Sequence, residues 1–142
     1  MKAYLSRRYH FSASHRLHAE TLSADANREA FGKCNNPHGH GHNYTIEVTY
    51  SGQIDPETGM LLNLADLDAF AQQHLVNRFD VTNLNTLDLF QSVVPTTENL
   101  SVAIYSIFHE FAGARLEHLH VEETSNNAFD FAGTSLPRPG SY

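Results

Sequence analysis

The sequence predicts an α+β fold in which an antiparallel sheet of four strands is covered on one face by two helices. Period-two alternation occurs towards both ends of the chain, and two helical apolar stripes lie between them. The resulting order is strand, strand, helix, helix, strand, strand. We expect one domain over residues 1–142, because neither a repeat nor a linker divides the chain. A domain of this length folds without needing a disulfide or a metal for stability.

Two strands and a long loop are expected in the N-terminal third. Residues 4–15 alternate between apolar and polar, and His15 is the last residue on their inward face. Residues 42–50 alternate strictly and form the second strand. The intervening residues 17–41 lose this periodicity, apart from a short helical turn near 27–31. Long loops inside compact domains are usually functional, so this segment is a candidate region for a site.

Two amphipathic helices are expected in the middle of the chain. Asn63 is suited to cap the first, whose apolar residues recur at helical spacing to about Phe79. Pro95 and the two threonines after it mark the start of the second, which Gly113 ends. Each helix has one apolar stripe and should therefore lie on the sheet.

A closing hairpin is expected at the C-terminal end. Residues 116–123 alternate, and after Asn126-Asn127 the run 128–132 forms the last strand. Glu123 lies among apolar positions at the end of the first of these strands, where an unpaired carboxylate is costly. It should have a partner, such as a cationic side chain or the guanidinium-like edge of a ligand.

Composition and charge bound the possible partners. The net charge of −7 argues against binding to nucleic acid or to an anionic membrane surface. The sequence has no apolar stretch near the roughly 20 residues that span a bilayer. A single cysteine allows no internal disulfide, and the N-terminus does not resemble a signal peptide. A cytoplasmic location is therefore expected.

Three histidines form a candidate zinc site. His40 and His42 are two residues apart and so share one side of an extended chain, and Gly41 between them is expected to let the backbone approach closely. His15, at the end of the neighbouring strand, supplies a third nitrogen. Three protein ligands and one open position are the layout of a catalytic zinc site. The alternative is that these are exposed histidines at loop ends.

Cys34 has a functional and a structural interpretation, and Glu98 has a structural one. A thiol near zinc and Lys33 should have a lowered pKa, and its thiolate can act as a base or nucleophile. The alternative for Cys34 is a small buried apolar residue. The structural interpretation of Glu98 is that its carboxylate stabilises the N-terminus of the second expected helix.

A series of short segments resembles the 6-pyruvoyl-tetrahydropterin synthase family, in order along nearly the whole chain. They are 11–15 (FSASH), 31–37 (FGKCNNP), 39–44 (GHGHNY), 55–56 (DP), 59–60 (GM), 63–67 (NLADL), 96–99 (TTEN) and 123–124 (ET). The resemblance implies the T-fold, in which trimers close their sheets into a barrel. It also implies a homohexamer of two stacked trimers with active sites between subunits.

The resemblance implies a reaction and residue roles. The substrate is a pterin, 7,8-dihydroneopterin triphosphate, from which triphosphate is eliminated to give 6-pyruvoyl-tetrahydropterin. Zn²⁺ on His15, His40 and His42 binds the side-chain oxygens, and Cys34 removes a proton. Glu123 anchors the amino-pyrimidine edge of the pterin, and a segment of three residues lines the same pocket: Thr96, Thr97 and Glu98. Candidate cations for the triphosphate are Lys33, Arg7, Arg8, Arg16 and Arg28.

One position departs from the family pattern. The family's Asp-His pair, which assists the catalytic cysteine, falls on Asp80 and Val81, and valine carries no proton. Such a relay typically contributes ~10² to 10⁴ in rate, so binding should survive better than turnover. His38, four residues after Cys34, is a hypothetical substitute, and a solvated loop histidine is its alternative.

Several other functions remain open. The spacing from Cys34 to His40 resembles the pyruvoyl-forming branch, but a 6-carboxy-tetrahydropterin synthase of queuosine synthesis is the enzymatic alternative. A dihydroneopterin aldolase-like activity is a further one. The loss of the histidine at Val81 is also compatible with a pterin-binding zinc protein that has weak or no lyase activity. The ten histidines finally allow a histidine-rich metal buffer, which would bind several metals per chain.

Overall fold

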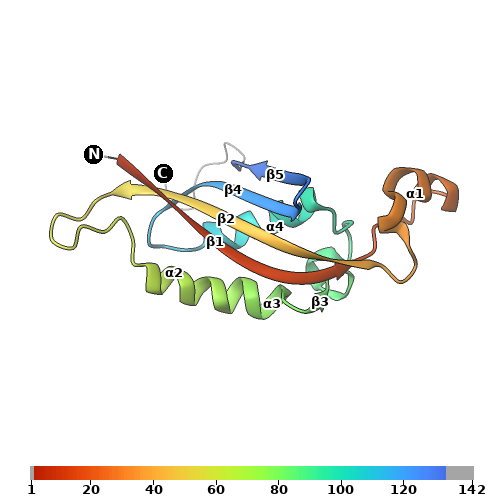
Figure 1. The fold of residues 1–142 in the computed structure, drawn as a ribbon, viewed down its shortest axis with the longest axis horizontal. Coiled ribbons are helices and arrows are strands. Elements are labelled where there is room, and N and C mark those ends of the chain that lie inside the picture. Colours follow the sequence, from red (N-terminus) through yellow and green to blue (C-terminus); the bar gives the residue numbers. More distant parts are fainter. Residues whose placement is uncertain (1, 134–142) are drawn as a thin grey trace.

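The computed structural model describes residues 2–133 and contains a twisted five-stranded sheet with helices on one face (Figure 1). The strands are β1 (Lys2–His15), β2 (His40–Gln53), β3 (Thr82–Asn83), β4 (Arg115–Thr124) and β5 (Asn127–Phe131). Their spatial order is β3-β1-β2-β4-β5. The four long strands follow the predicted antiparallel arrangement, which confirms the α+β class.

The fifth strand, β3, is a correction to the predicted four-stranded sheet. It pairs in parallel with Ala13 and Ser14 of β1, at the edge of the sheet. Two residues are too few to show alternation, so the sequence pattern contains no trace of it. The pairing depends on the position at which the preceding helix ends, which is a tertiary effect.

The β1–β2 pair determines where the site lies. The two strands pair from Lys2 opposite Gln53 to His15 opposite His40. Alternate residues on one face of each strand are buried, and this face packs against the helices. The inward face therefore begins as an apolar core and ends, at the last pair of residues, in imidazole side chains.

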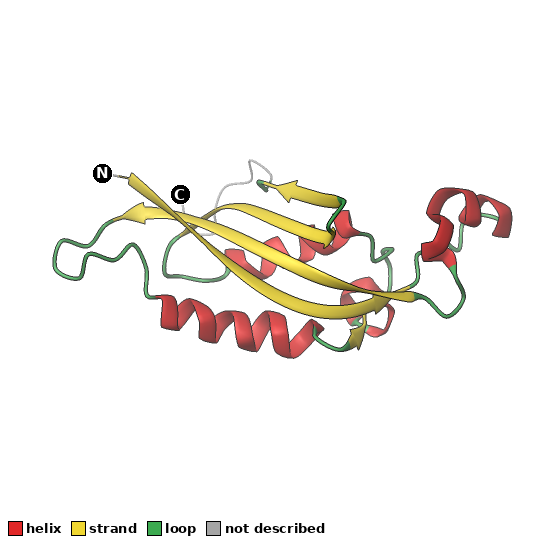
Figure 2. Cartoon of the chain, viewed as in Figure 1, coloured by secondary structure: helices red, strands yellow, loops and turns green. Residues whose placement is uncertain are grey.

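Two helical rods cover the inward face of the sheet (Figure 2). The first comprises α2 (Leu64–Ala71), a π-helical segment (Gln72–Val76) and α3 (Asn77–Phe79). The second is α4 (Thr97–His109). The predicted cap at Asn63 is present, and Thr96 caps the second rod at its predicted start. The apolar stripes of both rods are buried: Leu67, Ala71, Leu75, Phe79, Leu100, Ile104 and Phe108. No helix within residues 2–133 is long and apolar enough to cross a membrane.

The loop between β1 and β2 contains more structure than the expected short turn. It forms α1 (Ala24–Phe31), which is followed by a 3₁₀ turn over Gly32–Asn35. Figure 1 shows α1 beyond the end of the sheet, where β1 ends and β2 begins. The buried Asn27 stabilises this segment, because its side chain bonds to the backbone of Ala19, Leu22 and Ser23.

The outer face of the sheet, which is turned away from the helices, carries polar cross-strand pairs. Arg8 Nε donates to Glu47 Oε2 at 2.6 Å, and Ser6 and Thr49 share a hydrogen bond. On β4 and β5, His120 Nδ1 lies 2.8 Å from Asp130 Oδ1. The hydrogen bond to Asp130 raises the pKa of His120 above its ordinary value.

The pair between His120 and Asp130 should make stability depend on pH near neutrality. Because the folded pKa of His120 is raised, its contribution is complete below about pH 6.5 and is lost as the pH rises through the folded pKa. The contribution should be at most about 1 kcal/mol, since Asp130 is exposed and its charge is screened. Urea unfolding should show that the free energy of unfolding of wild type exceeds that of His120→Gln at about pH 5.5, and that this difference shrinks at about pH 8.5. Asp130→Asn should remove the larger share of this pH-dependent part and leave the share due to Glu122, which lies 3.2 Å from His120 Nε2. The same difference in unfolding free energy between wild type and His120→Gln at both pH values would contradict the assignment.

Candidate metal centre

The site lies at the end of the β1–β2 pair, where the register sets His15 beside His40. The turn into β2 passes very close to β1 at Gly39, whose φ is +68°. A Cβ at this position would lie 2.6 Å from the carbonyl oxygen of His15, so only glycine fits. At Gly41 the corresponding distance to Ala13 is an ordinary 3.7 Å. The close approach that the sequence suggested for Gly41 therefore belongs to Gly39.

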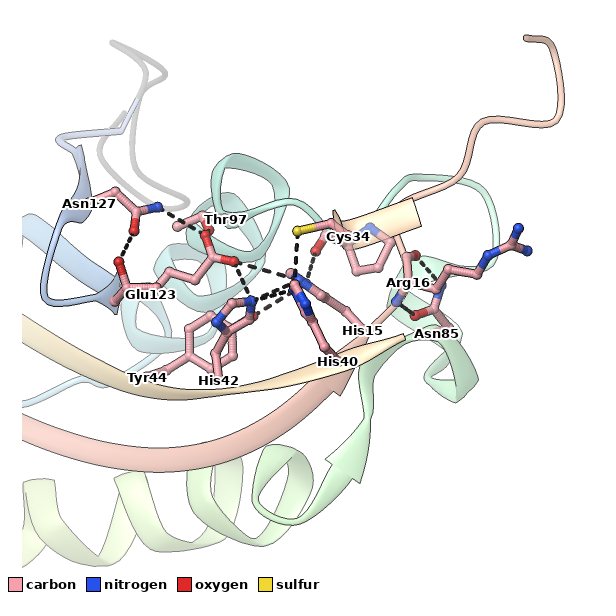
Figure 3. Close-up of polar contacts among 12 residues, drawn as sticks. His15, Arg16, Cys34, His40, His42, Tyr44, Asn85, Thr97, Glu123 and Asn127 are labelled. Carbon is pink, nitrogen blue, oxygen red and sulfur yellow. Dashed lines mark hydrogen bonds and ion pairs between the residues drawn. The ribbon is translucent and has the colours of Figure 1, made fainter. Parts of the chain in front are cut away.

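Four side chains converge on one point (Figure 3). The Nε2 atom of His42 lies 3.2 Å from Nε2 of His15 and 3.0 Å from Nε2 of His40. Cys34 Sγ lies 3.1 Å from the same atom of His40. All four donor atoms lie within 4.8 Å of one another, and no other such group occurs within residues 2–133. The predicted three histidines are thus brought together in an arrangement that could hold a metal ion.

The backbone orients His15 for ligation. The residue is 1% exposed, and its Nδ1 lies 3.0 Å from the carbonyl oxygen of Pro95. Since a carbonyl only accepts, Nδ1 carries the proton and donates it, which leaves the lone pair of Nε2 for a metal. Pro95 had been expected only to mark a helix start, so this role was missed. A carbonyl partner has no signature in the sequence.

The environment also favours the neutral form of His15 and His42. Burial, together with the charge of His42, lowers the pKa of His15. Burial likewise lowers the pKa of His42. Neutral imidazole is the form that binds metal, so these shifts favour ligation at neutral pH.

Cys34 is half-buried and tied to the end of β1. Its carbonyl oxygen accepts a 2.7 Å hydrogen bond from Leu17 N–H, and Asn35 Nδ2 donates to the carbonyl of Leu17 at 2.7 Å. Burial and the charge of Glu123 raise the pKa of the thiol. Without a metal, the protein environment therefore acts against the expected lowering, which included the effect of bound zinc. A bound metal would act in the opposite direction.

Glu123 has the partners that its position required. Its Oε2 accepts hydrogen bonds from Thr97 Oγ1 at 2.6 Å and Asn127 Nδ2 at 3.1 Å, while Oε1 lies 2.8 Å from His42 Nε2. Burial acts to raise the pKa of Glu123, but these hydrogen bonds and the nearby histidines lower it. The carboxylate is thus held ionised beside the histidines. Asn127 was not foreseen, because only the turn at residues 126–127 was apparent.

The structure separates the other predicted site residues from this cluster. Thr96 caps α4, and Glu98 is exposed in the first turn of that helix. Asp80 Oδ1 accepts a 2.9 Å hydrogen bond from the backbone N–H of Ser12. Val81 is 86% exposed, and His38 is exposed in the loop.

A cavity of about 470 Å³ opens beside His40 and is rich in cationic side chains. Arg16, Arg28 and Lys33 all line it. The backbone of Arg16 is fixed by Asn85, whose amide side chain bonds to both its N–H and its carbonyl. The remaining two candidate cations lie elsewhere and pair with carboxylates of the sheet and α2: Arg7 with Asp68 and Arg8 with Glu47.

The fold and this cluster define the chain as an α+β protein with a candidate metal centre at one end of its sheet. The family model described as 6-pyruvoyl tetrahydropterin synthase matches residues 4–134. A human protein named 6-pyruvoyl tetrahydrobiopterin synthase is 45% identical over 134 residues, which are 93% of this chain and 92% of that protein. A Drosophila melanogaster protein of the same name is 43% identical over 99% of this chain and 84% of its own length.

A solved structure agrees with these relatives. The structure of Caenorhabditis elegans 6-pyruvoyl tetrahydropterin synthase matches with a TM-score of 0.89 and 36% identity, covering 94% of this chain and 97% of that chain. The chain belongs to the 6-pyruvoyl tetrahydropterin synthase family, which is a family of enzymes. The T-fold that the resemblance implied is consistent with this match.

Proposed function

We propose that the chain is a zinc-dependent lyase that eliminates triphosphate from 7,8-dihydroneopterin triphosphate to give 6-pyruvoyl-tetrahydropterin. The observation that carries this proposal is the convergence of His15, His40 and His42 with Cys34, beside a cavity lined by cations. The names of the relatives, which match over nearly the whole chain, support the same reaction.

The donor set fits zinc. Zinc–nitrogen bonds of about 2.0–2.1 Å in tetrahedral geometry place neighbouring nitrogens about 3.3 Å apart. The nitrogen separations around His42, 3.0 and 3.2 Å, are close to this value. Bound there, zinc would act as a Lewis acid that polarises oxygens of the substrate side chain and acidifies the adjacent carbons.

The chain supplies the proton acceptor and the pterin anchor. Cys34 Sγ is 3.1 Å from His40 Nε2 and therefore lies within reach of a substrate held at the histidines, where its thiolate would accept a carbon-bound proton. Glu123 would bind the amino-pyrimidine edge of the pterin. Thr97 supports this role because its hydroxyl orients the carboxylate. Thr96 and Glu98 would then contribute through the helix start that holds Thr97.

The cationic cavity is suited to the triphosphate. Arg16, Arg28 and Lys33 converge on a space that also reaches His40, so an anionic leaving group would lie next to the zinc-bound part of the substrate. Arg28 is partly neutralised by its ion pair with Asp25. Lys33, one residue before Cys34, is therefore the more informative position to change.

Lys33→Ala should weaken substrate binding by ~10-fold or more, because it removes a charged contact worth roughly 1.5–3 kcal/mol. The measurement is KM for dihydroneopterin triphosphate together with the inhibition constant of inorganic triphosphate. Arg8→Ala is the matched control, since Arg8 pairs with Glu47 on the outer face. Equal effects of the two substitutions would indicate general electrostatics and would contradict a site in this cavity.

We further propose a homohexamer with active sites between subunits. Asp80 bonds to Ser12 in its own chain and makes no side-chain hydrogen bond to the cluster among residues 2–133. A catalytic role for Asp80 would therefore be exerted on a neighbouring copy. Light scattering of the pure protein tests the assembly.

A pterin-binding zinc protein with little turnover is the second candidate, favoured by the valine at position 81. Incubation with dihydroneopterin triphosphate, followed by assay of released triphosphate and of the pterin product, separates the two. Tight pterin binding without release would defeat the lyase proposal. A 6-carboxy product would favour the queuosine-type relative, and cleavage of the side chain would indicate an aldolase-like activity.

A further inference from the structure

The fourth member of the converging group, Cys34, is placed as a metal ligand would be. Its sulfur lies within 4.8 Å of all three histidine nitrogens and 3.1 Å from Nε2 of His40. With a zinc–sulfur bond of about 2.3 Å, tetrahedral geometry places sulfur about 3.5 Å from a neighbouring nitrogen. A small movement of one side chain would bring Cys34 to that separation.

We propose that Cys34 is the fourth ligand of the resting metal, and that a pterin must displace its sulfur to bind. The inference rests on the zinc site proposed above and deepens it. It turns an open three-histidine centre into a closed centre of three nitrogens and one sulfur. In the absence of substrate, the residue proposed as proton acceptor would therefore be bound to the metal.

The backbone around Cys34 is built to hold the sulfur there. Two hydrogen bonds join the 3₁₀ turn Gly32–Asn35 to Leu17, just after the end of β1. In one, Leu17 N–H donates to the carbonyl of Cys34, and in the other, Asn35 Nδ2 donates to the carbonyl of Leu17. Leu17 is itself buried and follows His15 by two residues. Cys34 and His15 are thus positioned by the same short segment, which is how ligands distant in sequence keep a fixed geometry.

Glu123 is the rival fourth ligand, and the geometry disfavours it. Its Oε1 lies 2.8 Å from His42 Nε2 and 3.6 Å from His15 Nε2, yet it does not belong to the group whose donors all lie within 4.8 Å. Its other oxygen is engaged by Thr97 and Asn127. The carboxylate therefore flanks the centre, whereas the thiol completes it.

The proton balance of this arrangement is simple. On ligation, the Cys34 thiol releases its proton to solvent, and its sulfur takes the position that a water would otherwise hold. When a pterin side chain takes over that position, the sulfur leaves as a thiolate beside the substrate. It can then accept the substrate proton and become a thiol again. This route forms the thiolate without an imidazole at position 81.

Replacement of zinc by Co²⁺ tests the inference through a readout that does not depend on turnover. Wild type loaded with one cobalt per chain should show the near-ultraviolet thiolate-to-cobalt charge-transfer band and the intense visible bands of a tetrahedral site. Cys34→Ser should lose the thiolate band and bind zinc ~10-fold or more weakly. Glu123→Gln is the matched control and should keep the band. Addition of 7,8-dihydroneopterin to wild type should remove it.

X-ray absorption of the zinc form provides a second measurement, with one sulfur expected at about 2.3 Å. One cobalt per chain without a thiolate band would overturn the inference while leaving the proposed lyase intact. Visible bands of a tetrahedral site that appear in wild type without the thiolate band, and that change in Glu123→Gln but not in Cys34→Ser, would instead assign the fourth position to the carboxylate. A band that persists in the pterin complex would overturn the displacement step. Failure to bind any metal would defeat the zinc proposal itself.

Discussion

Replacement of His15 by alanine should abolish metal binding and turnover together. The Nε2 atom of His15 faces that of His42, and its Nδ1 is fixed on the carbonyl of Pro95, so the substitution removes a ligand that the fold holds in its binding orientation. We expect one zinc per chain in wild type and nearly none in the variant after dialysis, by elemental analysis. Turnover should fall to background, because the proposed substrate oxygens would lose their Lewis acid.

Two other histidines are controls for this result. His10 lies on the outer face of the same strand, where it bonds to Thr45, and His10→Ala should keep one zinc and full activity. His38→Ala tests the hypothesis that this exposed residue assists Cys34: loss of turnover with zinc retained would support it, and an unchanged rate would end it. Retention of zinc by His15→Ala would refute the proposed centre. Several zinc ions per wild-type chain would favour a metal buffer.

The sequence was sufficient for the parts of the site that follow from alternation. Period two places His15 on the inward face of β1, and the same period places His40 and His42 on one side of β2. Antiparallel pairing then brings the end of the first strand beside the start of the second. The buried face of the sheet and the apolar stripes of both helical rods follow from the same local rules.

The missing parts depend on individual contacts that alternation does not indicate, whether their partners are near or far in the sequence. The carbonyl of Pro95, which orients His15, and the amide of Asn127, which holds Glu123, are 80 and 4 residues from their partners. Neither residue type indicates such a role. In the protein alone, burial and the charge of Glu123 raise the pKa of Cys34, and neither contribution is visible from the adjacent Lys33 in the sequence. The placement of Asp80 against β1 follows from the parallel pairing of β3, which no local pattern indicates.

Val81 combines two unusual properties. Its φ of +55° is the only positive value among the non-glycine residues from 2 to 133, and a β-branched side chain is especially disfavoured there. Two hydrogen bonds to Ser12 hold this segment: Val81 N–H donates to the carbonyl of Ser12 at 2.6 Å, and Asp80 accepts from the N–H of Ser12. A backbone conformation of this kind destabilises the folded state by about 1–3 kcal/mol. The side chain of Val81 is exposed, so its packing does little to offset this strain.

The strain at Val81 changes how a substitution at this position must be designed. Asparagine and histidine both tolerate positive φ better than valine, so either should relieve strain and stabilise the protein by about 1 kcal/mol. Only histidine adds a group that carries a proton near neutral pH. Val81→Asn is therefore the matched control for Val81→His.

Val81→His should raise the turnover of dihydroneopterin triphosphate by ~10² to 10⁴ if a missing relay limits the natural chain. Val81→Asn should leave turnover unchanged while giving the same gain in unfolding free energy. Because Val81 is exposed and lies outside its own cluster, the new imidazole would act on Cys34 of a neighbouring copy in the proposed hexamer. Equal gains in turnover from both substitutions would assign the effect to strain. No gain from histidine would mean that thiolate formation at Cys34 does not limit the reaction, as expected if the metal already removes that proton.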